Sequence, residues 1–165
     1  MIYFEEIEIG HSVDLGSHHF SAEAIKVFAR AYDPQGFHLD KAIAAQSHFG
    51  ALCASGWQTA SVWMRLMVEH AKLEMQNAIA AGRKPAMLGP SPGFRDLKWL
   101  KPVYAGDTIA YSSTVTGKRE SASKPRWGLV EHHNIGVNQK GERVFEFIGT
   151  VFWERRPTSS RPRDV

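Results

Sequence analysis

The middle of the chain carries apolar side chains at intervals of three and four residues, which is the spacing of an α-helix. The pattern begins at Gly56 and ends at Gly82, where Arg83 and Lys84 complement the negative end of the helix dipole. Because the pattern covers much of the circumference, we predict a long helix in the middle of the fold rather than on its surface. The residues that form this pattern are Val62, Trp63, Leu66, Met67, His70, Leu73 and Ile79.

The residues beyond this helix alternate between apolar and polar side chains, as β-strands do. Strands are expected at residues 94–100, 108–119, 126–137 and 143–154. A polar turn containing Gly141 separates the last two and predicts a hairpin with a positive φ at the glycine. The last strand is apolar on both faces, so we expect the helix to cover one face and a partner subunit or loop the other. One face carries Phe145, Phe147, Gly149, Val151 and Trp153, and the other carries Val144, Ile148 and Phe152.

Shorter elements are expected before the long helix. A lead-in over residues 3–10 precedes a strand over residues 12–20, and Ser21 caps a short helix that ends at Asp33. Residues 40–47 predict one or two further helical turns. One long helix followed by a run of antiparallel strands is an α+β arrangement.

Length and composition favour a single globular domain, which we assign to residues 1–155. The chain has 165 residues, 43% of them hydrophobic, and this suffices for one ordinary core. No apolar run approaches the roughly 18 residues of a membrane span, and the start of the chain lacks the pattern of a signal peptide. A single cysteine, Cys53, excludes an internal disulfide. We therefore expect a cytoplasmic protein with no membrane partner.

The net charge of +3 arises largely at the end of the chain. Four of the 20 basic residues lie between Arg155 and Arg163, and the rest of the domain is close to neutral. The Pro, Ser and Arg content of residues 156–165 predicts a basic, disordered tail without the apolar anchors of a nucleic-acid-binding arm. We expect no nucleic-acid partner.

An aspartate and a histidine five residues apart, Asp33 and His38, are the strongest candidates for chemistry. The Asp33-Pro34 step moves the aspartate out of the helical region, and Gly36 allows the chain to bend back on itself. A carboxylate and an imidazole that face one small volume can share acid and base work on one water. Taken alone, the spacing is also compatible with a turn aspartate and a structural histidine.

The residues around this pair resemble a known family. The similar stretches are residues 31–40, Ala54-Ser55-Gly56-Trp57 and residues 99–107. They resemble the MaoC-like dehydratases, or R-specific enoyl-CoA hydratases, whose motif runs Asp-x-Asn-Pro-x-His-x-Asp. Asp33, His38 and Asp40 match this motif, whereas Gln35 replaces the asparagine and Gly36 the proline.

The resemblance implies a hotdog fold, in which an antiparallel sheet wraps a long central helix, and a homodimer or higher oligomer. It implies reversible hydration of a trans-2-enoyl-CoA to an R-3-hydroxyacyl-CoA, with no cofactor because coenzyme A is part of the substrate. Asp33 and His38 would hold and activate the water. Gly56 would supply a backbone N–H, at the start of the long helix, to the negative oxygen of the thioester.

Two other functions remain open at this point. A hotdog thioesterase would hydrolyse the same thioester with a carboxylate, but the predicted helix has no acidic residue early in its length. A non-catalytic subunit that binds acyl-CoA is the other alternative, because Gly36 stands where the family motif has proline. The sequence does not specify the acyl group.

The remaining polar candidates have structural explanations. Asp40 and Ser55 are expected to cap helices, and Cys53 lies among apolar neighbours as a small buried thiol. The pairs His18-His19 and His132-His133 have no acidic or cysteine partner at ligand spacing, so we predict no metal.

Large aromatic and basic residues offer weaker hypotheses about the substrate. Three tryptophans are candidates for an acyl tunnel, although core packing is the commoner role of such residues. Three basic residues near a predicted strand edge are candidates for the phosphates of coenzyme A, although a solvated face is the commoner role. These residues are Trp57, Trp63 and Trp99, and Arg95, Lys98 and Lys101.

Overall fold

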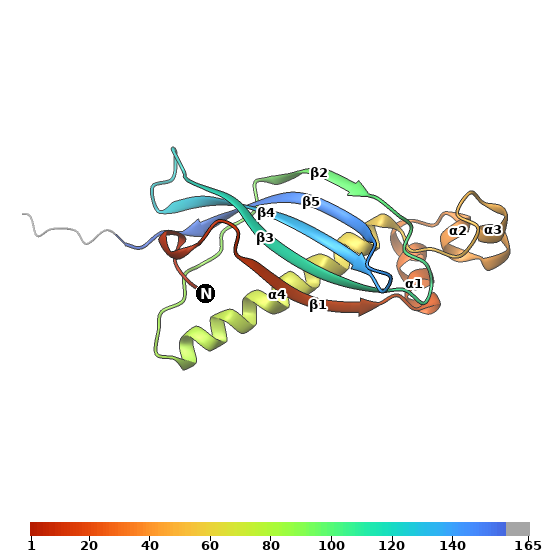
Figure 1. Ribbon diagram of the computed structural model, residues 1–165, viewed down its shortest axis with the longest axis horizontal. Helices are drawn as coiled ribbons and strands as arrows, with labels where there is room; N and C mark the ends of the chain where they lie inside the picture. The colour runs from red at the N-terminus through yellow and green to blue at the C-terminus, as the bar shows by residue number, and fades with distance from the viewer. Residues whose placement is uncertain (158–165) are drawn as a thin grey trace, which may run out of the picture.

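A computed structural model describes residues 1–157 of the chain. Figure 1 shows a curved antiparallel sheet around one long helix, α4. The strand order is β1-β3-β4-β5-β2, and every neighbouring pair is antiparallel. The strands are β1 (Ser12–His19), β2 (Gly93–Trp99), β3 (Thr108–Glu120), β4 (Trp127–Asn138) and β5 (Arg143–Glu154). The disordered tail predicted at residues 156–165 lies, from residue 158 onward, outside the described residues.

All the described helices precede the strand-rich half of the chain, and the strand β1 lies among them, between η1 and α1. They are η1 (Phe4–Glu6), α1 (Ala22–Tyr32), α2 (Gly36–Leu39), α3 (Lys41–Gln46) and α4 (Gly56–Ala80). In Figure 1, α1, α2 and α3 gather at the end of the sheet where α4 begins. The α+β class and the sheet wrapped around a central helix are confirmed. The one-turn helix α2 was not expected from the sequence.

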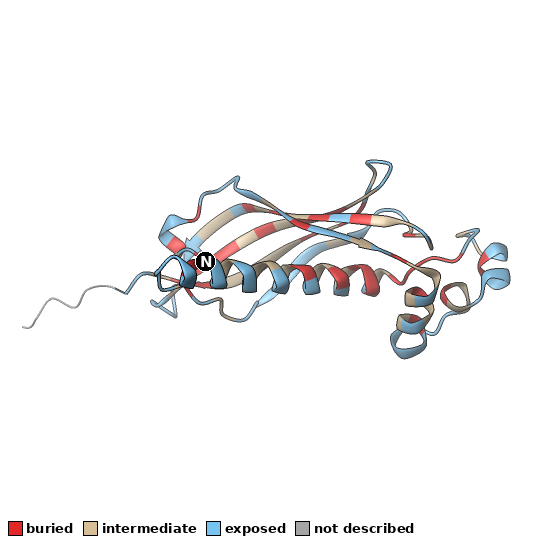
Figure 2. Ribbon diagram, turned by 90° about the horizontal axis from the view of Figure 1, so that it is seen from below, coloured by how far each residue is buried: buried red, intermediate tan, exposed pale blue. Residues whose placement is uncertain are grey.

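The long helix is buried on one side only. Figure 2 shows α4 lying along one face of the sheet, with exposed residues on its outer side. Val62 and Leu66 are buried, whereas Leu73 and Ile79 are 53% and 62% exposed. The sequence counted these two residues among the apolar positions around much of the helix, but in the single chain the sheet covers only one side of it.

The core lies between α4 and the concave face of the sheet. Phe145 and Phe147 of β5 pack in it with Leu66 of α4, as predicted from the alternation in β5. The Tyr111 hydroxyl donates to the carbonyl oxygen of Thr59 at 3.1 Å, which joins β3 to the first turns of α4. On the opposite face of β5, Val144 is also buried and belongs to the same cluster, and its carbonyl oxygen accepts from the backbone N–H of Leu100 in the segment after β2.

Local signals in the sequence are confirmed at several element ends. Ser21 accepts from the backbone N–H of Ala24, Asp40 Oδ1 accepts from the N–H groups of Ala42 and Ile43, and Ser55 Oγ accepts from that of Trp57. These contacts satisfy donors that would otherwise be free in the first turn of each helix.

Gly36 differs from its predicted role. It is the first residue of α2, and its φ is not positive. A Cβ on Gly36 would lie 2.9 Å from Cγ2 of Ile43 in α3. A side chain at this position would therefore have to displace the Ile43 side chain, and the glycine allows the close approach of two short helices without supplying a positive-φ bend.

No helix within residues 1–157 is long and apolar enough to cross a membrane.

Candidate functional site

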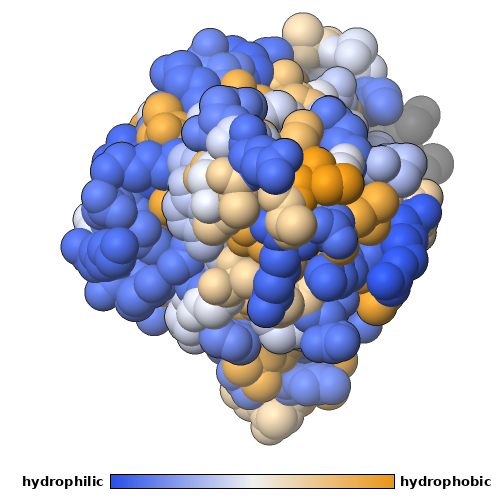
Figure 3. Space-filling model, turned by 90° about the vertical axis from the view of Figure 1, so that its right-hand side faces the viewer, coloured by the Kyte–Doolittle hydropathy of each residue, from blue (hydrophilic) through white to orange (hydrophobic). Residues whose placement is uncertain are grey.

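Asp33 and His38 come together at the junction of α1 and α2. Asp33 is the residue at which α1 ends, and His38 lies in the single turn of α2. Asp33 Oδ2 lies 3.4 Å from His38 Nε2. Figure 3 views the molecule from the side where α2 and α3 lie, and hydrophobic side chains gather there within a largely hydrophilic surface. The His38 side chain is 6% exposed and that of Asp33 is 18% exposed, so the pair is sheltered but reachable.

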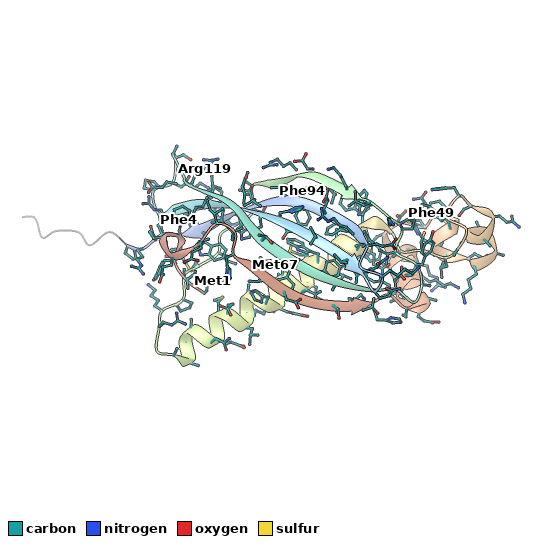
Figure 4. All side chains as sticks on the ribbon, viewed as in Figure 1. Met1, Phe4, Phe49, Met67, Phe94 and Arg119 are labelled. Carbon is teal, nitrogen blue, oxygen red and sulfur yellow. The ribbon has the colours of Figure 1, made fainter. Side chains whose placement is uncertain are left out.

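The other nitrogen of His38 fixes the tautomer of the neutral ring. Nδ1 lies 2.7 Å from the carbonyl oxygen of Cys53. A carbonyl oxygen only accepts, so Nδ1 carries the hydrogen and Nε2 of the neutral ring has a free lone pair. Phe37 and Phe49 pack beside the ring, and Figure 4 labels Phe49 at this end of the molecule. The lone pair is thereby aimed at the Asp33 carboxylate.

The surroundings of Asp33 keep it ionised. Burial raises the pKa of its carboxyl, but hydrogen bonds from Ser55 and Gln35, and the positive charge of the His38 ring when that ring is protonated, together lower that pKa below its usual value. The side-chain amide of Gln35 donates to Asp33 Oδ1 at 2.7 Å. Gln35, which replaces the asparagine of the family motif, thus contacts the carboxylate directly. Two acceptors face each other, and one water can donate a hydrogen to each.

The start of α4 lies beside this pair because both of its members contact the segment that leads into the helix. His38 contacts Cys53 and Asp33 contacts Ser55. Gly56 is the first residue of α4, and its backbone N–H has no acceptor among the described residues. A free N–H at the positive end of a 25-residue helix is suited to a developing negative charge.

A tryptophan ring covers Gly56. Atoms of the Trp99 ring lie where a Cβ on residue 56 would stand. Trp99 also packs against Trp57, edge to face, with ring centroids 5.2 Å apart. Gly56 therefore has a packing role in addition to the predicted role of its N–H, and Trp99 lies between the start of α4 and solvent.

A cavity of about 390 Å³ opens between α4 and the sheet. Figure 4 labels Met67 of α4 and Phe94 of β2, two of its lining residues. Neither the Asp33/His38 pair nor Gly56 lines it, but Trp57, the residue after Gly56, does. Its walls are almost entirely apolar. They include two of the three predicted tunnel tryptophans, Trp57 and Trp63.

Two polar residues of the cavity, His132 and Asn134, come from β4. His132 is buried, and burial lowers the pKa of its ring to about 4, so the ring is neutral at pH 7. Its neighbour on the same face, Asn134, is 1% exposed. The sequence marks His132 only as half of a histidine pair and gives no signal for Asn134. The alternation in β4 places both toward α4, but no local motif marks them.

His132 should make the fold sensitive to acid. Its folded pKa of about 4 lies below the ordinary value of about 6.5, so the unfolded chain binds a proton between these values that the folded chain does not. The free energy of unfolding should therefore fall as pH decreases from about 6.5 to 4. Phenylalanine cannot titrate and can still stack on Trp153. For His132→Phe, we expect the loss of stability between pH 7 and pH 4.5 to be smaller by about 2 kcal/mol than in the wild type. Urea unfolding at the two pH values measures this, and equal losses in the two proteins would contradict it.

The side chains of the remaining candidates have structural explanations. Cys53 is buried, and burial raises the pKa of its thiol to about 11, which makes it unreactive. The three basic candidates are exposed, and each pairs with a carboxylate. These pairs are Arg95 with Asp96 and Glu131, Lys98 with Glu146, and Lys101 with Glu142. Such pairs are typical of a solvated face.

Comparison with known families gives one match over most of the chain. Residues 5–135 match the profile described as "MaoC like domain". A crystal structure of a MaoC-like dehydratase from Rhodospirillum rubrum is similar to this chain, with a TM-score of 0.76 and 32% identity, over 96% of this chain and 100% of that one. The resemblance inferred from the motifs is confirmed.

Two further relatives are hydratases by name. The (R)-hydratase from A. caviae has a TM-score of 0.62 and 22% identity over 93% of this chain and 99% of that one, and shows the shared hotdog fold. The mesaconyl-CoA hydratase of Cereibacter sphaeroides is 37% identical over 68 residues, which are 41% of this chain. The match spans only 20% of the length of that enzyme.

Proposed function

The chain belongs to the MaoC-like domain family, and from this premise we propose that it hydrates a trans-2-enoyl-CoA reversibly to an R-3-hydroxyacyl-CoA. The family is of the hydratase and dehydratase type, so the chain is a hydro-lyase at this level. One observation supports the specific reaction. Two hydrogen-bond acceptors, Asp33 Oδ2 and His38 Nε2, face each other and lie 3.4 Å apart. The R configuration rests on the resemblance to the family.

The pair would activate one water. The two hydrogens of this water would point at the Asp33 carboxylate and at His38 Nε2, which leaves an oxygen lone pair directed at C3 of the substrate. One member of the pair removes a proton as the oxygen–C3 bond forms, and the site then returns a proton to C2. The elements of one water are thus added across the C2–C3 double bond, and no cofactor is consumed.

The start of α4 would stabilise the negative charge that develops on the thioester oxygen. The free N–H of Gly56 is the donor that this proposal requires, and the dipole of α4 acts in the same direction. The thioester would lie between Gly56 and the Asp33/His38 pair. The acyl chain would then pass Trp57 into the cavity under α4, since Trp57 both follows Gly56 and lines the cavity.

One assay separates this function from its two alternatives. The protein is incubated with crotonyl-CoA, and both the enoyl absorbance and the release of free thiol are followed. A hydratase lowers the absorbance without releasing thiol, a thioesterase releases thiol, and a binding subunit does neither. The first acidic residue of α4 is Glu69, far from the start of the helix, which favours hydration over hydrolysis.

We also propose that the protein is a homodimer or higher homo-oligomer. Apolar side chains around the mouth of the cavity are exposed in the single chain, and a symmetric partner would cover them. They are Trp57, Met64, Val68 and Phe94.

Light scattering should therefore give a mass of at least about twice the 18.5 kDa of one chain at micromolar concentration. Met64→Glu places a charge on this face and should increase the monomer fraction. Val27→Glu is the matched control, because Val27 is as exposed as Met64 but lies on α1 and does not line the cavity. A wild-type protein that is wholly monomeric would contradict the proposal.

A further inference from the structure

The two oxygens of the Asp33 carboxylate have different surroundings. Oδ2 faces His38 Nε2 at 3.4 Å. Oδ1 accepts from Gln35 Nε2 at 2.7 Å, which is at the short end of the range for a hydrogen bond to a charged oxygen. One oxygen is therefore held by an amide, and the other is left for the water of the proposed reaction.

The backbone of Gln35 lies between the two members of the pair. Its N–H donates to the carbonyl oxygen of Asp33 at 2.8 Å, and its carbonyl oxygen accepts from the N–H of His38 at 2.9 Å. Gln35 is the N-cap residue of α2, but its side chain makes no capping bond to the helix. The side chain turns back to the carboxylate, so this residue contacts both members of the pair.

The carboxylate needs such partners to keep its orientation. The bond between Cβ and Cγ of an aspartate joins an sp³ to an sp² carbon, and rotation about it has no sharp staggered minimum. A second donor, the buried hydroxyl of Ser55, also makes a hydrogen bond to the Asp33 carboxyl. The two donors come from different segments, one before α2 and one before α4. Together they resist rotation of the carboxylate away from His38.

The stability of the fold does not account for the contact with Gln35. This residue is exposed, and a side-chain hydrogen bond at the surface contributes little to the free energy of folding because water offers the same partners. Its effect falls on Asp33. Burial raises the pKa of that carboxyl, and the hydrogen bonds from Ser55 and Gln35 favour the ionised form and lower the pKa. Among the described residues, His38 is the titratable group that faces the carboxylate.

We propose that Gln35 is a positioning residue, which holds Asp33 Oδ1 so that Oδ2 stays directed at His38 Nε2 and at the water that the pair shares. The inference rests on the proposed function, and it gives Gln35 no contact with the substrate. The family motif has asparagine at this position. Glutamine is longer by one methylene group, and in this chain its amide reaches the carboxylate itself.

Removal of the amide should lower turnover and leave the affinity for the substrate unchanged. Gln35→Met keeps the length of the side chain but has no donor. The kcat for crotonyl-CoA hydration should fall about tenfold, whereas KM should change by less than about twofold, because the lost bond is to the carboxylate and not to the substrate. Steady-state kinetics at neutral pH measures both constants, and thermal melting checks the fold.

Gln35→Glu gives a result that a structural role would not produce. When protonated, the introduced carboxyl group can donate its O–H to Asp33 Oδ1 as the amide does, and when ionised it repels the aspartate. Two facing carboxyl groups raise the pKa at which the pair loses its last proton. The rate relative to wild type should therefore fall about tenfold or more from about pH 5 to about pH 8. For Gln35→Met this ratio should stay constant.

The titration of Asp33 provides a test that needs no turnover. Burial raises the pKa of this carboxyl in both proteins, but Gln35→Met loses one of the hydrogen bonds that lower it, so the pKa should be higher in the variant. Carbon NMR of protein labelled at the aspartate carboxyl groups measures the pKa, and Asp33→Asn identifies the resonance.

Gln46→Met and Gln46→Glu are the matched controls. Gln46 is an exposed glutamine at the end of the neighbouring helix α3, and its side chain makes no hydrogen bond within residues 1–157. Both variants should match the wild type in kcat, in KM, in the pH dependence of the rate and in the titration of Asp33.

The outcomes separate this inference from the proposed function. A kcat of Gln35→Met within about twofold of wild type, a loss that appears in KM instead, or a rate ratio of Gln35→Glu that does not change with pH would overturn the positioning role. If Gln35→Glu fails to fold, Gln35→Met and the titration decide. A wild-type protein that does not hydrate crotonyl-CoA refutes the proposed reaction. In that case an unchanged pKa of Asp33 in Gln35→Met would show that Gln35 does not hold the carboxylate, and a raised pKa would show that it does.

Discussion

Replacing Asp33 with asparagine or His38 with alanine is expected to remove nearly all hydratase activity, and the double variant should lose little more than either single variant. Both groups hold one water, so once one is gone the other has no productive partner. Asparagine has the size of aspartate and can still accept from Gln35, so the loss should be chemical rather than structural. Crotonyl-CoA hydration by the wild type, both single variants and the double variant measures the effect.

Asp40→Asn is the matched control for this experiment. Asp40 belongs to the same motif and lies two residues after His38, but its carboxylate caps α3 and does not face the pair. Asparagine caps helices as well as aspartate does, so this variant should keep its activity. A well-folded Asp33→Asn protein that retains more than about a tenth of the wild-type rate, a loss of ~1.4 kcal/mol or less, would mean that Asp33 is only a turn residue.

Gly56→Val is expected to lower kcat about a hundredfold, with a much smaller effect on the affinity for coenzyme A thioesters. The side chain would crowd the N–H that is proposed to stabilise the thioester oxygen, and the loss of one such donor costs about this much. The kinetic constants for crotonyl-CoA hydration measure the effect, and the split between kcat and KM indicates its cause.

A clash with Trp99 is a second explanation for the loss of activity expected of Gly56→Val. A side chain at residue 56 would collide with the Trp99 ring, and this clash alone could disturb the site. Trp99→Ala removes the obstacle, so we compare it with the double variant Gly56→Val/Trp99→Ala. We expect the double variant to remain as slow as Gly56→Val. Recovery to the rate of Trp99→Ala would show that Gly56 is needed only for packing.

The sequence predicted the fold well because its main signals are periodic and local. Alternation over residues 143–154 and helical spacing after Gly56 each report which face of one element is apolar, and this needs no knowledge of its neighbours. Caps such as Ser21 and Asp40 act on residues two or three positions away, so they too could be identified directly. The exposed outer side of α4 could not be predicted, because an apolar surface can be buried either by the same chain or by another.

The Asp33/His38 pair was found from the sequence because five residues separate its members, and a turn brings them together. What surrounds the pair was decided by tertiary structure. His38 is oriented by a carbonyl 15 residues away, and Trp99 reaches Gly56 from the end of β2. Such contacts depend on how the segments dock, which no local pattern encodes.

By itself, the sequence determined the class of fold, the family and the two groups proposed to hold the water, because periodicity and a short motif are properties of neighbouring residues. Only the tertiary structure decided which nitrogen of His38 is free and that Trp63 and Asn134 share one cavity. These two residues lie on different elements, and only the packing of α4 on the sheet makes both of them line the same cavity.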